Sequence, residues 1–183
     1  MRQLKHHEKK LLKKTDLYSW KSENNLREAK IVQKYLLQDR EDYIKYSKIA
    51  GHITKFTAKL KALPQTDPLR FQLAEQLLQK LYNMGIVSST SSLSAIEQLT
   101  VSAFCRRRLP VVMVRLKMSE TIKEATTFVE QGHIRVGPNV ITDPAFLVTR
   151  TFEDYVTWVD SSKIKRTIMK YNDKLDDFDL LGN

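Results

Sequence analysis

Apolar residues recur at helical spacing through the first half of the chain. They form one stripe over residues 42–63, which predicts an amphipathic helix that Pro64 ends. A second helix is predicted from Pro68, because Asp67 can cap it and proline fits the first helical position. Gly85 is placed to end this helix, and two such helices joined by a few residues predict an antiparallel hairpin. The expected inner face of the second helix consists of Leu69, Leu73, Leu77 and Leu81.

The pattern changes after a serine-rich stretch, residues 88–94, which predicts a loop and a domain boundary. Two short helices are predicted next, over residues 109–116 and 121–131, and Gly132 ends the second. Four short β-prone runs follow, HIRV, NVI, FLVT and YVTWV, separated by Gly-Pro and Asp-Pro pairs. A last helix is predicted over residues 161–174. The fold class is therefore α+β, with helices first and a small mixed unit after them.

This order of elements divides the chain into four expected segments. A basic N-terminal arm and the helical hairpin occupy residues 1–90, and a linker or short helix occupies residues 91–105. The mixed α+β unit covers residues 106–160. A C-terminal helix and an acidic tail make up residues 161–183.

Charge adds a class of partner to this architecture. Lys and Arg number 31 against 21 acids, which gives a net charge of +10 and a pI near 9.6. Such an excess attracts polyanions, and nucleic acid is the commonest of these in cells. Cys105 is the only cysteine, so we expect neither an intrachain disulfide nor a cysteine-held metal. No apolar run is long enough to span a bilayer, so no membrane partner is expected.

The mixed unit opens with a run of cations that contains no acid before Glu120. The apolar residues of the first short helix are expected to face inward and so to force these cations toward solvent; they are Leu109, Val112, Met113 and Leu116. A helix pair and a strand that present Arg and His form a basic surface suited to structured RNA. The candidate RNA-binding residues of this unit are Arg106, Arg107, Arg108, Arg115, Lys117, His133, Arg135 and Arg150.

The N-terminal arm is a second candidate RNA contact. Its cations include Lys9, Lys10, Lys13 and Lys14, and basic arms commonly order on phosphate. The alternatives are a nuclear-import signal and a solvated helix face. Leu17 and Trp20 form an apolar cluster on this polar arm, which predicts an anchor for a protein partner.

Motifs for catalysis are missing from the sequence. There is no Gly-rich phosphate loop, no nucleophile elbow and no cysteine with a base at a recognisable spacing. The four histidines have no clustered carboxylates or cysteines beside them. We therefore expect a protein that is not an enzyme, with no cofactor, no metal and no small-molecule substrate.

The segment from residue 107 onward resembles the S4-type RNA-binding domain of the ribosomal protein S4 family. The resemblance lies in RRLPVVMVRLKM, a helix of the form SxTxxEAxxFVEQ, the strand entry GHIRV, and the later LVTR and YVTWV. It implies two short helices packed on a small antiparallel sheet that binds RNA. Many members of that family carry arginines where this chain has Ile122 and Thr126. We therefore expect the first helix, His133, Arg135 and Arg150 to take a larger share of RNA binding.

The whole chain also resembles the S4-related subunits of the U3 small nucleolar ribonucleoprotein. The matching runs are LKHHEKKLLKKTDLYSW, REDYIKYSKI, LPQTDPLR and GPNVITDPAFLVTRTFEDYVTWVD. This resemblance implies a nucleolar protein that promotes pairing of U3 RNA with the 18S rRNA precursor. It implies as partners U3 snoRNA, pre-18S rRNA, the M-phase phosphoprotein scaffold of the particle and other processome proteins. Two alternatives remain, a structural ribosomal protein of the S4 family and an adaptor whose RNA contact is incidental.

Overall fold

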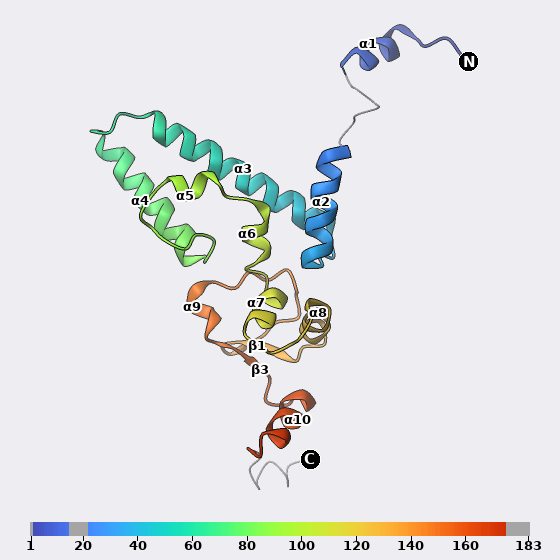
Figure 1. The fold of residues 1–183 in the computed structure, drawn as a ribbon, viewed down its shortest axis with the longest axis vertical. Helices are drawn as coiled ribbons and strands as arrows, with labels where there is room; N and C mark the ends of the chain where they lie inside the picture. The colour runs from blue at the N-terminus through green and yellow to red at the C-terminus, as the bar shows by residue number, and fades with distance from the viewer. Residues whose placement is uncertain (1, 15–21, 175–183) are drawn as a thin grey trace.

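The first half of the protein is helical, as its apolar pattern predicts (Figure 1). The computed structural model describes residues 2–14 and 22–174. The helices of this half are α1 (His6–Lys14), α2 (Ser22–Tyr35), α3 (Arg40–Ala62) and α4 (Pro68–Asn83). Leu17 and Trp20, the predicted anchor for a protein partner, lie outside the described residues.

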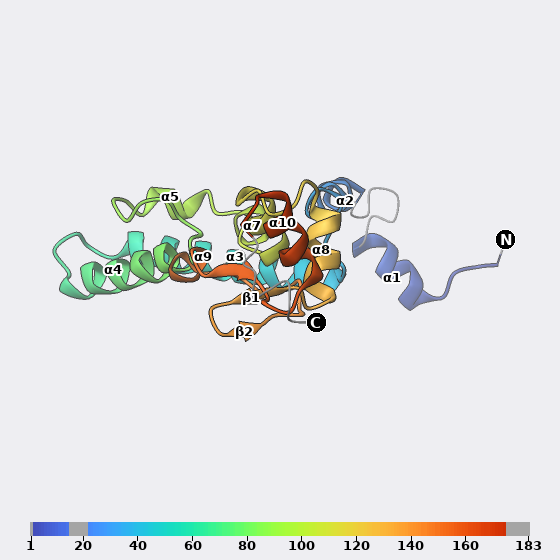
Figure 2. The same cartoon turned by 90° about the horizontal axis from the view of Figure 1, so that it is seen from below.

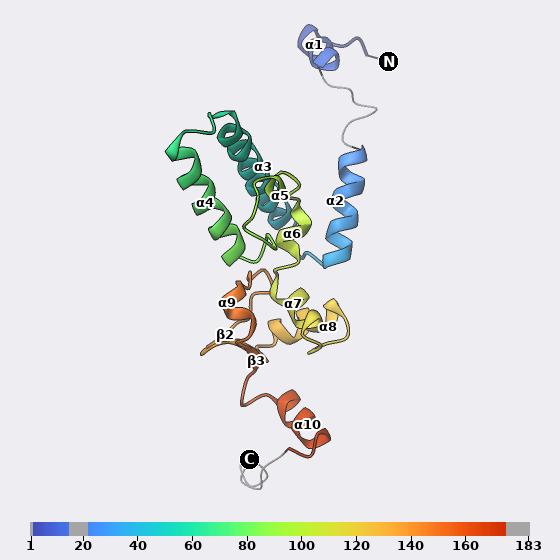
Figure 3. The same ribbon diagram turned by 60° about the vertical axis from the view of Figure 1, so that its left-hand side comes forward.

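Helices α3 and α4 form the predicted antiparallel hairpin (Figures 1 and 3). The side chain of Asp67 accepts a hydrogen bond from the Leu69 N–H at 3.0 Å, so the predicted cap of α4 is confirmed. Gly85 follows α4 with φ of +71°, a left-handed conformation typical of a helix end. The predicted inner face of α4 is wrong in its first half, because Leu69 and Leu73 are exposed. The core covers only the later turns of this helix, at Leu78 and Leu81.

Two short helices follow the hairpin and pack on α3. They are α5 (Ser94–Glu97) and α6 (Val101–Cys105). Ile96 of α5 and Phe104 of α6 are buried, and the Phe104 ring stacks on Tyr46 of α3 with centroids 5.7 Å apart. The segment between the hairpin and the mixed unit therefore contributes to the hydrophobic core.

The mixed unit pairs α7 (Leu109–Arg115) and α8 (Ile122–Glu130) with a three-stranded antiparallel sheet (Figures 1 and 2). The strands are β1 (Ile134–Val136), β2 (Asn139–Val140) and β3 (Val156–Trp158), with β1 in the centre. The short helix α9 (Arg150–Glu153) precedes β3. One cluster fills the space between these elements, formed by Leu109, Val112, Met113, Ala125, Val129, Ile134, Val136, Val148 and Val156.

Two details of the prediction for this unit are wrong. The run FLVT is not a strand of the sheet, because its backbone pairs with the segment that enters α7. The Leu109 N–H donates to the Phe146 carbonyl at 2.9 Å, and the Val148 N–H donates to the Arg107 carbonyl at 2.8 Å. Leu116 does not face inward, because α7 ends at Arg115 and leaves this leucine partly in solvent.

The last described helix, α10 (Lys163–Tyr171), stands beyond the sheet (Figure 3). It begins at Ser162, whose side chain accepts a hydrogen bond from the Ile164 N–H at 3.2 Å. None of its residues is buried. Over residues 2–14 and 22–174, no helix has both the length and the apolar character needed to cross a membrane.

Candidate nucleic-acid interface

The three consecutive arginines before α7 differ sharply in exposure. Arg106 is exposed, whereas Arg107 is 5% and Arg108 only 2% exposed. The prediction that all three face solvent is therefore wrong for Arg107 and Arg108. They lie in the turn between α6 and α7, where the chain passes between the helical half and the mixed unit, so their side chains enter the packed interior.

Arg108 joins the mixed unit to the helical half of the chain. Its Nη1 atom donates to Oδ2 of Asp42 at 2.9 Å, and Asp42 belongs to the first turn of α3. A buried arginine without an acidic partner would be strongly destabilising, so this pair has to form when the protein folds. The guanidinium of Arg108 is consequently occupied within the protein and is not available to a phosphate.

Arg107 is held in a similar way by the segment around α9. Its Nε donates to the Val148 carbonyl at 2.9 Å, and its Nη1 donates to Oε2 of Glu153 at 3.0 Å. Gly85 makes room for it, since a Cβ at that position would lie 2.7 Å from the guanidinium carbon. Glu153 also accepts a hydrogen bond from Arg115 of α7.

Glu153 is therefore a carboxylate shared by two arginines. Its partial burial alone would raise the pKa of the carboxyl. The hydrogen bond from Arg107 and the positive charges of Arg115 and Arg107 outweigh that effect and leave the pKa below its usual value. Glu153 thus stays ionised at neutral pH and fixes one edge of the basic surface.

Arg150 also forms hydrogen bonds within the protein. Its Nε and Nη2 donate to the backbone carbonyls of Tyr82 and Val87, each at 2.9 Å. The guanidinium carbon lies 4.1 Å from the centre of the Tyr82 ring, within cation–π range. Arg150 is half-buried and clamps the mixed unit onto the end of α4. The sequence did not predict these contacts, and RNA binding by Arg150 stays a prediction.

Arg106, Arg115 and Lys117 remain as surface cations around α7. The side chain of Arg115 is 51% exposed although it pairs with Glu153. Arg106 and Lys117 are exposed and form no ion pair with any residue that the structure describes. Lys117 has φ of +60° just after α7, in a conformation that glycine usually adopts at a helix end.

Two predicted RNA-binding residues at the start of the sheet, His133 and Arg135, contact the C-terminal part of the chain. His133, just before the strand, has its Nδ1 atom 3.0 Å from Oγ of Ser162. Arg135 donates to Oγ1 of Thr157 at 3.1 Å and to Oδ2 of Asp160 at 2.6 Å. His133 thus helps to fix a turn, and Arg135 lies at the surface beside an acid.

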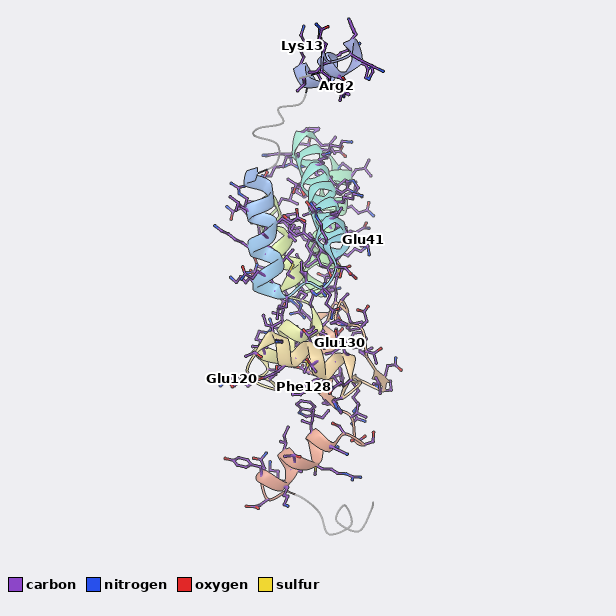
Figure 4. The ribbon with its side chains drawn as sticks, turned by 90° about the vertical axis from the view of Figure 1, so that its right-hand side faces the viewer. Arg2, Lys13, Glu41, Glu120, Phe128 and Glu130 are labelled. Carbon is purple, nitrogen blue, oxygen red and sulfur yellow. The ribbon has the colours of Figure 1, made fainter. Side chains whose placement is uncertain are left out.

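The cations of the N-terminal arm lie on α1, away from the hairpin (Figure 4). Lys9, Lys10 and Lys13 are exposed, and Lys14 ends the helix. Leu11 and Leu12 are also exposed, so within this chain they do not dock the helix on the core.

Sequence reasoning missed the acids that organise this surface. Asp42, Glu153 and Asp160 each bind one or two of the predicted RNA-binding arginines. Asp42 is 66 positions from Arg108, and Glu153 is 46 from Arg107. No local spacing signals such contacts, which only the tertiary fold creates. The described residues contain no group of three or more histidines, cysteines and acids that could hold a metal ion.

Comparison with known proteins places this geometry in a family. A model of the ribosomal protein S4/S9 N-terminal domain matches residues 3–106, and a model of the S4 domain matches residues 107–153. The U3 small nucleolar ribonucleoprotein protein IMP3 of Saccharomyces cerevisiae is 56% identical, over 98% of each chain. The human protein of that name is 49% identical, again over 98% of each chain. A small ribosomal subunit protein uS4 of Picrophilus torridus is 26% identical over 81% of each.

The length of the chain agrees with that of the first two relatives. The match to each covers 98% of this chain and so extends beyond the S4 domain over the helical half and the C-terminal helix. This chain therefore belongs to the family of the U3 small nucleolar ribonucleoprotein protein IMP3.

Proposed function

We propose that this protein is a nucleolar RNA-binding assembly factor of the U3 small nucleolar ribonucleoprotein. The observation that carries this proposal is the end-to-end identity with proteins named for that particle in yeast and human. The proposed task is to promote pairing of U3 snoRNA with the pre-18S rRNA during early processing of the small-subunit rRNA. The proposed partners are these two RNAs, the M-phase phosphoprotein scaffold of the particle and other processome proteins.

The mechanism that fits the surface is electrostatic. Two RNA strands repel one another through their phosphates, and cations placed where the strands converge lower that repulsion. Arg106 would supply this charge from the end of α6, Arg115 from the end of α7 with Lys117 just after it, and Arg135 from β1. Base pairing between the RNAs would provide sequence specificity, and the protein would read backbone and shape.

The arm would extend this contact. Lys9, Lys10, Lys13 and Lys14 lie in one short helix, and among the described residues no hydrophobic core cluster includes a residue of this helix. The exposed lysines of such a helix can bind the phosphates of an RNA backbone. Leu17 and Trp20, which follow it in sequence, are the proposed anchor for a protein of the particle. No chemistry on the RNA is proposed for this chain.

Crosslinking in cells tests the proposal. The protein would be crosslinked to RNA, purified, and the attached fragments sequenced. We expect reads on U3 snoRNA and on the pre-18S rRNA, and fewer of both for Arg106→Ala combined with Lys117→Ala. The matched control is Lys55→Ala with Lys59→Ala, which removes two exposed cations from α3. Absence of U3 reads would refute the assignment to the particle.

A structural ribosomal protein of the S4 family is the second candidate, because the uS4 match covers four-fifths of the chain. Sedimentation separates the two functions. An assembly factor sediments with large precursor particles and is lost from mature small subunits. A structural protein stays with the mature subunit, and that result would transfer the proposal to the ribosome.

A further inference from the structure

Helix α10 is a strongly basic element that lies outside the matched S4 domain. Its nine residues, KIKRTIMKY, include four cations and no acid. Lys163 and Lys170 are exposed on one face, two turns apart, which places them about 10 Å from each other along the axis. No residue of this helix is buried, so it adds little to the hydrophobic core.

The start of α10 is nevertheless tied firmly to the S4 sheet. The Val159 N–H donates to the His133 carbonyl at 2.9 Å. Ser162, only 4% exposed, caps the helix and lies 3.0 Å from the His133 ring nitrogen. These bonds fix the direction in which the helix leaves the domain. An exposed basic helix held at a defined angle is arranged to present its charges to a partner.

Two cations at this junction share one carboxylate. Arg135 of β1 and Lys165 of α10 both bind the carboxylate of Asp160, from opposite oxygens. That carboxylate has a side chain 62% exposed, so a dissolved anion can reach the same two cations. Arg135 is already a proposed RNA contact, and an RNA phosphate carries the charge and the acceptor oxygens that Asp160 offers.

We propose that α10, together with Arg135, forms a second phosphate-binding element that extends the RNA surface beyond the S4 domain. Lys163 and Lys170 contact successive parts of an RNA backbone, and a phosphate exchanges with Asp160 at Arg135 and Lys165. Tyr171, 88% exposed at the end of the helix, lies where it can stack on a base. This inference rests on the proposed RNA-binding function and adds a site to it.

The lowered pKa of Asp160 agrees with this arrangement. The hydrogen bond from Lys165 is its main cause, desolvation opposes it, and the charges of Arg135 and Lys165 and the hydrogen bond from Arg135 add to the lowering. Asp160 is therefore ionised at neutral pH, and in the free protein it keeps the two cations close together. An RNA phosphate that binds these cations therefore has to displace the Asp160 carboxylate.

The test measures the salt dependence of binding of the full chain to a fluorescent RNA duplex with a single-stranded extension. Lys163→Ala with Lys170→Ala is expected to flatten the slope of log affinity against log salt by about 1.4 to 1.8, for two lost phosphate contacts. The matched control, Lys55→Ala with Lys59→Ala on α3, removes the same charge and should keep the wild-type slope. Alanine favours helix, so loss of α10 would not explain a change.

A second variant tests the exchange at Asp160. Asp160→Asn frees Arg135 and Lys165 and should tighten RNA binding about two- to fivefold, the strength of an exposed ion pair. Glu41→Gln, which removes an exposed acid from α3, is the control and should change affinity less (Figure 4). Weaker RNA binding by Asp160→Asn would overturn the proposal that a phosphate replaces the Asp160 carboxylate at Arg135 and Lys165.

The outcomes separate this inference from the proposed function. If the wild-type chain binds the RNA without salt dependence, the proposed function itself fails. If wild type binds as expected and the α10 variant keeps the full slope, only the second element fails. A protein-docking helix would give that same unchanged slope, together with loss of processome proteins on Ile164→Ala with Ile168→Ala, and this result also overturns the proposal.

Discussion

At the scale of single residues, arginines two positions apart have opposite roles. Arg108 is buried against Asp42, and Arg106 is exposed. We expect Arg108→Ala to lower the free energy of unfolding by about 3 kcal/mol, because it leaves a carboxylate without its buried partner. Arg106→Ala should change it by less than about 0.5 kcal/mol, as exposed substitutions do. Urea denaturation of the two variants measures both values.

The same pair separates stability from RNA binding. Arg106→Ala should flatten the salt slope of RNA binding by about 0.7 to 0.9, the effect of one phosphate contact. Arg108→Ala, measured where it is fully folded, should keep the wild-type slope. A flattened slope for Arg108→Ala with unchanged stability would show that its guanidinium reaches RNA, and the ion pair with Asp42 would not describe the protein in solution.

At the scale of elements, local sequence signals were sufficient wherever the structure depends on neighbours in the chain. The cap at Asp67, the proline after it and the glycines after α4 and α8 define helix ends through contacts within a few residues. The run FLVT has the composition of a strand but pairs with the entrance to α7, a contact across about forty residues. The burial of Arg107 and Arg108 depends on such distant partners too, so a local pattern of cations could not reveal it.

Two glycines test which backbone positions the elements require. Gly51 lies within α3 with open space around it, so Gly51→Ala should raise the free energy of unfolding by about 0.5 to 1 kcal/mol. Gly85 has φ of +71°, and a Cβ at this position would lie 2.7 Å from the guanidinium carbon of Arg107. Gly85→Ala should lower the free energy of unfolding by at least about 1 to 2 kcal/mol, the strain of a left-handed alanine. Thermal unfolding of both variants measures these changes. A Gly85→Ala variant more stable than wild type would contradict the predicted clash between a Cβ at position 85 and the Arg107 guanidinium.

At the scale of the whole molecule, two arginines that the sequence predicts to bind RNA connect the helical half to the S4 domain. Arg108 reaches α3, and Arg150 reaches the end of α4. These two contacts fix the orientation of the S4 domain relative to the helical half. They therefore also fix the positions of the exposed cations around α7 relative to the helical half. The exposed Arg106 is followed directly by Arg107 and Arg108, which are buried between the two halves. A substitution at one of these buried arginines can therefore change the orientation of Arg106.

Arg150 gives the sharpest test of this joint. Arg150→Ala removes two hydrogen bonds from a charged group, and Val87 loses its carbonyl partner. We expect the free energy of unfolding to fall by about 2 to 3 kcal/mol. Amides of residues 85–93 should exchange faster with deuterated solvent, because that segment loses its link to the S4 domain.

Arg150→Lys is the matched control, since it keeps the charge but cannot bind both carbonyls at once. If Arg150 belongs to the joint, both variants speed hydrogen exchange in residues 85–93, and neither flattens the salt slope of RNA binding. If it is a phosphate contact, alanine flattens the slope by about 0.7 to 0.9, lysine preserves it, and hydrogen exchange stays unchanged. The second result would restore Arg150 to the RNA surface and leave Arg108 as the arginine that joins the two halves.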